Sequence, residues 1–201
     1  MLVKICGITN REDALAAVEG SAGALGFNFY SESPRYIRPE AAAQISELVP
    51  EYVLKVGVFV NETPVEVARL LREAGLDLAQ LHGNETAETV PGSVRIWKAF
   101  RVTPQWHAGL LEGFQAEAFV LDAAPDALFG GSGETFDWSS AQGIHKKIVL
   151  AGGLDASNVA LAIQTARPWG VDACSRLEKS PGRKDHGKML RFLRAAQMEY
   201  L

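Results

Sequence analysis

The chain is poor in cysteine and in long apolar runs, and each shortage excludes a class of protein. Two cysteines among 201 residues cannot supply the disulfide framework of a secreted scaffold. No apolar stretch approaches the ~20 residues of a membrane-spanning helix. Residues 1–8 lack the basic leader, long apolar region and cleavage site of a secretory signal. We therefore expect a cytoplasmic protein with reduced thiols and no membrane partner.

The chain also lacks an excess of positive charge and a cluster of histidines. Its net charge of −4 gives no support for a nucleic-acid partner. The four histidines are dispersed, and no metal-ligand spacing occurs among them. A phosphorylated small molecule remains a possible ligand, because backbone amides hold phosphate without a basic composition.

Short apolar runs rich in β-branched residues recur at intervals close to the length of one strand–helix unit. Several of them are apolar at consecutive positions, as is typical of parallel strands that are covered on both faces. The predicted strands are Leu2–Ile8, Ala24–Tyr30, Tyr52–Val60, Leu76–His82, Val94–Val102, Ala118–Ala124, Lys146–Gly152 and Gly170–Ser175.

Helical patterns lie between these strands. Thr63, Pro64 and Glu66 form an N-cap, a first-turn proline and a capping acid. The segments after the fourth and sixth strands carry weaker patterns and predict one or two turns. The stronger helices are predicted at Arg11–Glu19, Pro39–Leu48, from Thr63 onward, at Ser157–Ala166 and at Lys188–Met198.

Eight such units without a Pro- or Ser-rich linker predict an α/β fold, a single-domain (β/α)8 TIM barrel with parallel strands spanning residues 1–201. An open doubly wound sheet is the structural alternative. In a barrel, the site is built from the C-terminal ends of the strands and the loops after them. Unusual polar and glycine residues concentrate there: Cys6, Asn28, Arg35, Asn61, His82, Arg101, Asp122, the Gly152-Gly153 pair and Ser175.

Cys6 ends the first strand and has two readings. It is either a small buried core residue or a general base, and a thiol needs a nearby cation to work as thiolate. Lys4 lies on the same face of the strand and is a candidate for that cation, or else a partner for a barrel carboxylate. A further structural reading of Cys6 is an approach to Cys174, because the first and eighth strands are neighbours in a closed barrel, but strand alternation leaves the bridging geometry open.

Asp122 ends the sixth strand, directly after an apolar run. An aspartate there either pins the following loop or, partly withdrawn from water, serves as a general acid. A thiol and a carboxyl facing one pocket are what an acid–base isomerisation needs. Gly152 and Gly153 end the seventh strand, where barrels of this type often bind phosphate.

Three further features border the predicted pocket. The planar side chain of Arg35 suits a substrate carboxylate. His82 is expected to line the pocket rather than to bind a metal. The glycine-rich segment at residues 130–133 is either a flexible connector or a lid that excludes water.

Taken together, these motifs resemble the phosphoribosylanthranilate isomerase family of tryptophan biosynthesis. The matching stretches follow the family order along the whole chain. They are Lys4–Thr9, Gly26–Tyr30, Ser33–Tyr36, Val56–Asn61, Gln80–Gly83, Leu121-Asp122, Gly130–Trp138, Leu150–Leu154 with Asn158-Val159, Gly170–Glu178 and Pro181–Asp185.

The resemblance implies an Amadori rearrangement of N-(5′-phosphoribosyl)anthranilate to 1-(2-carboxyphenylamino)-1-deoxyribulose 5-phosphate, without metal or organic cofactor. It implies that Asp122 is the acid, that Cys6 is the base and that Arg35 binds the anthranilate carboxylate. The resemblance further implies that Asp172 contacts the sugar or supports Cys6, and His82 is expected to line the substrate pocket. The phosphate is expected at Gly152, Gly153, Ser175 and Arg176, and the enzyme is expected to be a monomer or a homodimer.

One position departs from the family pattern, which has glycine where this chain has Arg176. If that position needs a positive φ, arginine is strained there. Otherwise Arg176 either adds a charged phosphate contact or points away while its amide keeps the role. Two other functions stay open. One is the related aminoaldose isomerase of histidine biosynthesis, which has an aspartate in place of Cys6, and the other is a barrel that binds a phosphorylated ligand without turnover.

Overall fold

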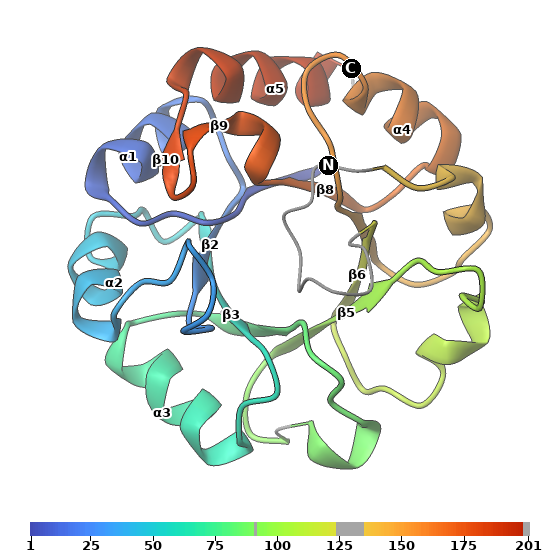
Figure 1. Cartoon of the computed structure of the whole chain (residues 1–201), viewed down its shortest axis with the longest axis horizontal. Coiled ribbons are helices and arrows are strands. Elements are labelled where there is room, and N and C mark those ends of the chain that lie inside the picture. The colour runs from blue at the N-terminus through green and yellow to red at the C-terminus, as the bar shows by residue number, and fades with distance from the viewer. Residues whose placement is uncertain (91, 124–134, 199–201) are drawn as a thin grey trace.

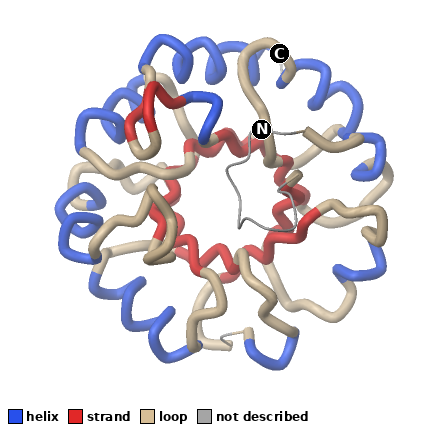
Figure 2. Tube along the Cα trace, viewed as in Figure 1, coloured by secondary structure: helices blue, strands red, loops and turns tan. Residues whose placement is uncertain are grey.

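The computed structural model describes residues 1–90, 92–123 and 135–198 and shows a closed barrel of eight parallel strands. Neighbouring strands in sequence are neighbours in the sheet, and helices surround the ring (Figures 1 and 2). Each strand lies within its predicted range, so the (β/α)8 prediction is confirmed. The strands are β1 (Leu2–Ile5), β2 (Ala24–Asn28), β3 (Leu54–Phe59), β4 (Leu78–Leu81), β5 (Ile96–Arg101), β6 (Ala118–Asp122), β7 (Ile148–Leu150) and β8 (Gly170–Ala173).

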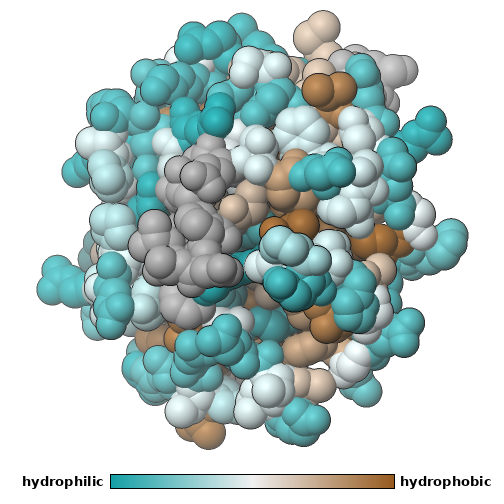
Figure 3. Space-filling view, turned by 45° about the vertical axis from the view of Figure 1, so that its right-hand side comes forward, coloured by the Kyte–Doolittle hydropathy of each residue, from teal (hydrophilic) through white to brown (hydrophobic). Residues whose placement is uncertain are grey.

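The outer layer is uneven around the ring. Five α-helices cover one part of it: α1 (Arg11–Glu19), α2 (Pro39–Ser46), α3 (Pro64–Glu73), α4 (Val159–Ala166) and α5 (His186–Met198). The weak helices predicted after β4 and β6 are the short 3₁₀ turns η1 (Ala87–Thr89) and η3 (Trp138–Ala141). A similar turn, η2 (Ala108–Leu111), follows β5. On the face shown in Figure 3, hydrophilic side chains cover most of the outer rim.

The elements between β8 and α5 were not predicted. After β8 come a 3₁₀ turn, η4 (Ser175–Leu177), and a two-stranded antiparallel hairpin, β9 (Glu178–Ser180) and β10 (Arg183–Lys184). The hairpin lies beside α1 over the barrel end near β1 and β8 (Figure 1). It supplies two buried charged residues, Glu178 and Lys184, to the region above the strands.

Strand alternation divides the barrel into an apolar exterior and a layered interior. Side chains such as Ile5, Phe27 and Leu121 point outward into the core beneath the helices. The lower interior is filled by a second apolar cluster that includes Leu78, Trp97 and Val120. The upper interior, at the C-terminal strand ends, is polar. Its inward side chains are Cys6, Asn28, Gln80, His82, Asp122, Asp172 and Cys174.

The barrel closes between β1 and β8. Leu2 pairs with Gly170 and Ile5 with Ala173, and the Cys6 N–H donates to the Ala173 carbonyl at 3.0 Å. This register sets Cys6 level with Cys174. Within the described ranges, no helix combines the length and the apolar character needed to cross a membrane.

The predicted N-cap of α3 is present, since the Thr63 side chain accepts a hydrogen bond from the Glu66 N–H. Replacing Thr63 with alanine leaves that donor without its cap, so we expect Thr63→Ala to lower the free energy of unfolding by ~1 kcal/mol. Urea denaturation measures the change. Val65→Ala, at an 80 % exposed position of the same turn, is the control and should change stability by less than ~0.5 kcal/mol. An unchanged midpoint for Thr63→Ala would show that the cap does not stabilise this helix.

Candidate active site

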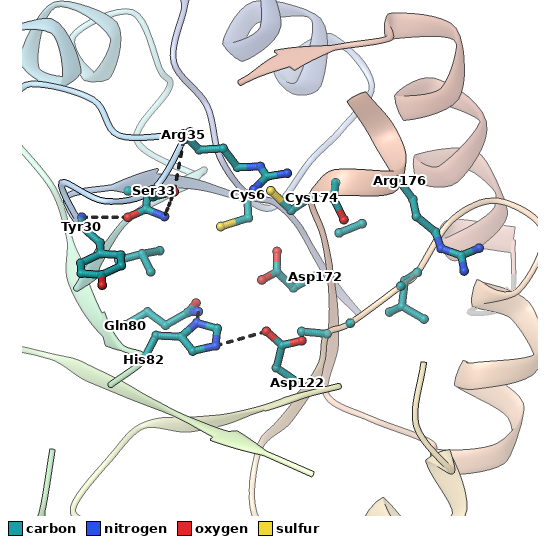
Figure 4. Close-up of a pocket in the computed structure, with 18 of the residues that line it drawn as sticks. Cys6, Tyr30, Ser33, Arg35, Gln80, His82, Asp122, Asp172, Cys174 and Arg176 are labelled. Carbon is teal, nitrogen blue, oxygen red and sulfur yellow. Dashed lines mark hydrogen bonds and ion pairs between the residues drawn. The ribbon is translucent and has the colours of Figure 1, made fainter. Parts of the chain in front are cut away.

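A pocket opens at the C-terminal ends of the strands, and it is lined by the predicted catalytic, substrate-binding and phosphate-binding residues. Its lining includes Cys6, Arg35, His82, Asp122, Gly152, Gly153, Asp172, Ser175 and Arg176. Figure 4 shows Cys6, His82, Asp122 and Asp172 around one cavity, with the side chain of Arg176 directed away from them. Two other polar strand-end residues lie elsewhere. Asn61 accepts a hydrogen bond from the Asn84 N–H at 2.7 Å, and Arg101 borders a neighbouring cleft.

Lys4 and Asp172 form a buried ion pair at the floor of the pocket. Lys4 Nζ donates to Asp172 Oδ2 at 2.8 Å, and Lys4 is fully buried. Burial raises the pKa of Asp172 to about 7, against the opposing charge of Lys4. Burial opposes the charge on Lys4 as well, but Asp172 outweighs it, so the pKa of Lys4 is raised. Lys4 is therefore the partner of a barrel carboxylate, and its positive charge also acts to lower the pKa of Cys6.

Cys6 faces a second thiol. Both cysteines are free, and the register of β1 with β8 sets their side chains level in the same pocket. The neighbouring Cys174 raises the pKa of Cys6, and burial acts in the same direction while Lys4 opposes it. Cys6 in turn lowers the pKa of Cys174 to about 7, with burial opposing and the positive charges of Lys184 and Arg35 assisting. Cys174 is therefore the more acidic of the two thiols.

Asp122 lies across the pocket beside His82. The distance from His82 Nε2 to Asp122 Oδ2 is 3.1 Å, and both side chains are buried (Figure 4). On the other side of the ring, Gln80 Nε2 lies 3.3 Å from His82 Nδ1. An amide nitrogen that donates to Nδ1 leaves the ring proton on Nε2, facing the carboxylate. Asp122 is thus held in place by His82, and His82 is in turn held by Gln80, an inward-facing residue of β4.

The loop after β7 needs glycine. Gly152 has φ +81° and Gly153 has φ +59°, a region in which other residues are strained. A Cβ at Gly152 would lie 2.5 Å from the Ala123 nitrogen and 2.9 Å from Asp122 Oδ1. The loop is tied to α4 because Asn158 Nδ2 donates to the Gly153 carbonyl at 2.8 Å. The missing side chain at Gly152 therefore lets this loop lie directly against Asp122.

Arg176 is accommodated without backbone strain. It belongs to η4, and among the described residues the non-glycine positions with positive φ are Ser21, Asn61 and Arg167. Its guanidinium donates to Asp155 Oδ2 at 3.0 Å, which links the loops after β7 and β8. The strain considered from the sequence is absent, and the side chain contacts a carboxylate at the pocket edge.

The unpredicted hairpin places a charged cluster above the thiols. Arg35 binds Glu178 through two guanidinium nitrogens, with Nε–Oε1 and Nη2–Oε2 distances of 2.9 and 2.8 Å. Lys184 Nζ lies 3.1 Å from Glu178 Oε1 and 3.7 Å from Cys174 Sγ. Sequence reasoning assigned no role to Glu178 and Lys184, although both occur in the motifs after the eighth strand. Lys184 lies in a short polar segment without a periodic pattern of apolar residues, so nothing in the sequence indicated that its side chain is buried.

The arrangement offers a proton acceptor and a proton donor to one small molecule. The thiol pair comes from β1 and β8, and the carboxyl comes from β6. Among the described residues, no group of three His, Cys, Asp or Glu side chains is placed to hold a metal ion. The glycine-rich segment proposed as a lid, residues 130–133, lies outside the described part of the chain.

Comparison with known proteins gives one consistent result. The family model described as "N-(5'phosphoribosyl)anthranilate (PRA) isomerase" matches residues 3–195. The N-(5'-phosphoribosyl)anthranilate isomerase of Solibacter usitatus is 50% identical over 197 residues, which cover 98% of each chain. That of Trichlorobacter lovleyi is 47% identical over 199 residues and 97% of each chain.

Solved structures agree. The phosphoribosyl anthranilate isomerase of Thermotoga maritima superposes with a TM-score of 0.88 at 40% identity, covering 98% of this chain and 100% of its own. The Thermus thermophilus enzyme gives a TM-score of 0.90 at 37% identity, with coverages of 98% and 99%. A further phosphoribosyl anthranilate isomerase structure, described as a complex with reduced 1-(o-carboxyphenylamino)-1-deoxyribulose 5-phosphate, gives 0.84 at 38% identity, covering 98% and 100%.

The contact between Gly152 and Asp122 generates a stability prediction. Gly152→Ala adds a strained φ, worth ~1–2 kcal/mol, and a clash with the backbone of Ala123, worth a further ~1–3 kcal/mol. Gly143→Ala is a matched control, since Gly143 also has positive φ (+71°) but a Cβ there would meet nothing within 4 Å. Urea denaturation should therefore show a larger loss for Gly152→Ala. Equal losses in the two variants would contradict the tight packing of this loop on β6.

Proposed function

The chain belongs to the N-(5′-phosphoribosyl)anthranilate isomerase family, and we propose that it performs the isomerisation with Cys6 as the general base and Asp122 as the general acid. The reaction of the family is a step of tryptophan biosynthesis. It is an Amadori rearrangement that converts N-(5′-phosphoribosyl)anthranilate into 1-(2-carboxyphenylamino)-1-deoxyribulose 5-phosphate. The chemistry needs one proton delivered to an oxygen and one proton removed from a neighbouring carbon.

In the first step, Asp122 donates a proton to the ring oxygen of the ribose. The furanose ring opens and leaves a protonated Schiff base between C1′ and the anthranilate nitrogen. Cys6 then removes the proton from C2′, and the electrons of that C–H bond form the C1′=C2′ bond of an enolamine. Tautomerisation places a proton on C1′ and leaves the ketone at C2′.

The observation that carries this proposal is the shared pocket of Cys6 and Asp122 (Figure 4). The two side chains come from different strands, β1 and β6, and both point inward at the C-terminal ends. His82 holds the Asp122 carboxyl from one side at 3.1 Å, and the Lys4–Asp172 pair lies beside Cys6. An acid and a base in separate environments around one cavity are suited to successive proton transfers on a single sugar.

The remaining site residues are proposed to hold the substrate. Arg35 at the pocket edge is charged and planar, so it suits the anthranilate carboxylate. Asp172 lies on the floor of the pocket, where it is placed to contact the sugar. At the opposite side, the amides of Gly152 and Gly153, with Ser175 and the amide of Arg176, are proposed to bind the phosphate.

Two expectations about partners follow from the relatives. One solved relative is described as a complex with a reduced product, a phosphorylated small molecule, and that structure shares the fold of this chain. The Thermotoga maritima enzyme is described as dimeric, with monomers generated from it. For this chain we propose a phosphorylated small-molecule substrate and a monomer or homodimer working in the cytoplasm.

A barrel that binds the substrate without turnover is the second candidate function. It is favoured only if the chain holds phosphoribosylanthranilate tightly and leaves it unchanged. The presence of both Cys6 and Asp122 in one pocket disfavours this candidate. The histidine-pathway isomerase is disfavoured by the family match over residues 3–195.

The roles of the two groups are tested by removing each. We expect Cys6→Ala and Asp122→Ala each to lower kcat by at least ~100-fold, because each step then lacks its proton carrier. The assay supplies freshly made phosphoribosylanthranilate and follows the loss of its anthranilate-type fluorescence. Circular dichroism establishes that each variant is folded.

Asp77→Ala is a matched control for the aspartate. Asp77 precedes β4, and its carboxylate accepts the Lys55 N–H at 2.7 Å at the opposite end of the barrel. Its removal should leave kcat within about twofold of the unmodified enzyme. Near-normal turnover in a folded Cys6 or Asp122 variant would remove that residue from the mechanism.

The proposed carboxylate contact of Arg35 predicts a different kinetic signature. Because this interaction binds substrate and transition state alike, Arg35→Met should raise KM by at least ~10-fold while kcat changes less. Arg69→Met, at an ion pair with Glu66 on the outer face of α3, should change neither constant. A kcat defect with an unchanged KM would contradict the binding role.

A further inference from the structure

Cys174 has no part in the mechanism above, yet it lies beside the proposed base. Cys174 directly follows β8, and the register of β1 with β8 sets it level with Cys6. Both side chains line the same pocket (Figure 4). Since this register fixes both backbones, the closeness of the two thiols is built into the closure of the barrel.

We infer that Cys174 is a positioning residue for the base: the two thiols share one proton, and Cys174 holds the negative charge of the pair until Cys6 takes a proton from the substrate. The inference deepens the proposed function and rests on Cys6 as the base. It adds a second sulfur that keeps the first one ready near neutral pH.

The charges around the pair favour a single thiolate on the Cys174 side. There the cations Arg35 and Lys184 face one carboxylate, Glu178, which both of them contact. That group carries a net charge of +1 before the thiols are counted. Cys174 Sγ lies 3.7 Å from Lys184 Nζ, so a thiolate there neutralises the excess. Glu178 Oε1, at 3.9 Å from the same sulfur, accepts a hydrogen bond from Cys174 when that thiol is protonated, and its charge disfavours any further negative charge.

On the Cys6 side, the charges are already balanced. Lys4 is paired with Asp172 at 2.8 Å, and this pair is neutral as a unit once Asp172 has ionised, at a pH above its raised pKa of about 7. Across the cavity, Asp122 lies beside His82. A thiolate on Cys6 alone would therefore depend on Lys4, whose charge Asp172 already engages. The surroundings thus place the resting charge on Cys174 and the resting proton on Cys6.

One further titratable group approaches the hairpin from behind. Asp13 on α1 accepts the backbone N–H of Lys184 at 2.8 Å, and its other oxygen lies 2.8 Å from His186 Nε2. Asp13 contacts the backbone of β10, whereas the Lys184 ammonium reaches the thiols. The Asp13 carboxylate thus contacts the hairpin backbone and His186, and neither contact is with a thiol.

Protons are conserved through the proposed step. In the resting pair, Cys6 S–H donates to the Cys174 thiolate. The proton passes along this bond to Cys174, and the Cys6 thiolate so formed takes the proton from C2′. The pair then holds two protons, and it regains one thiolate when it gives a proton to C1′ of the enolamine or to water.

The test follows the thiolate and the reaction separately. In the ligand-free enzyme, ultraviolet thiolate absorbance should report one thiolate per chain, formed with a pKa of about 7. In Cys174→Ala, we expect the remaining thiol to titrate at least ~1 unit higher, toward or above the ordinary value of ~8.5. The acid limb of the pH profile of kcat/KM should move to higher pH by a similar amount. Cys174→Ala should therefore lose activity near neutral pH and regain it as the pH is raised.

Two further variants keep the test decisive. Cys174→Ser retains a hydrogen-bond donor to Cys6 but cannot hold the charge. The acid limb of its kcat/KM profile should therefore lie between those of the unmodified enzyme and Cys174→Ala. Cys6→Ala should lose turnover yet keep a Cys174 thiolate that titrates below ~8.5, because Lys184 and Arg35 remain. The serine variant also covers the case in which alanine disturbs the fold.

An unchanged thiolate titration and an unchanged acid limb in Cys174→Ala would overturn the inference. So would a resting enzyme without a thiolate near neutral pH. A failure of the proposed function is recognised differently, as normal turnover in Cys6→Ala. The absorbance titration needs no substrate, so it tests the shared proton even in that case.

Discussion

The pairing of β1 with β8 is the constraint on which the rest of the site depends. It closes the barrel in one register, with Ile5 opposite Ala173. From that register follow the Lys4–Asp172 ion pair and the adjacent placement of Cys6 and Cys174, since inward positions on the two strands meet level by level. A shift by one residue would turn these side chains out of the barrel and remove the site.

The interior is arranged so that charge is buried only where it is matched. A lone buried ammonium or carboxylate would be costly, and a pair is tolerated only with good geometry. Lys4 meets Asp172 at 2.8 Å, and Glu178 receives both Arg35 and Lys184. The apolar layer of Leu78, Trp97 and Val120 beneath them keeps water from the floor of the pocket. This apolar layer has a low dielectric constant, which strengthens the electrostatic interactions above it.

Much of this structure could be predicted from the sequence because it follows local patterns. Strand positions came from apolar runs, and Cys6 and Asp122 were identified because each ends such a run. Their convergence with Arg35 then followed from the barrel, in which the strand ends share one face. What could not be predicted depends on contacts distant in the chain. The hairpin that carries Lys184 shows no strand-like alternation of apolar and polar residues. The family pattern has glycine at position 176 and so raised the question of a positive φ there, but the residue lies in a 3₁₀ turn whose conformation suits arginine.

The most direct measurement is a crystal structure of this enzyme with a reduced, unreactive product analogue bound. The sugar carbon C2′ should lie within ~4 Å of Cys6 Sγ, and the oxygen derived from the ribose ring should lie within hydrogen-bonding distance, ~3 Å, of the Asp122 carboxyl. An analogue bound with these atoms on the far side of the pocket from either group, or in another cleft, would contradict the assignment of base and acid.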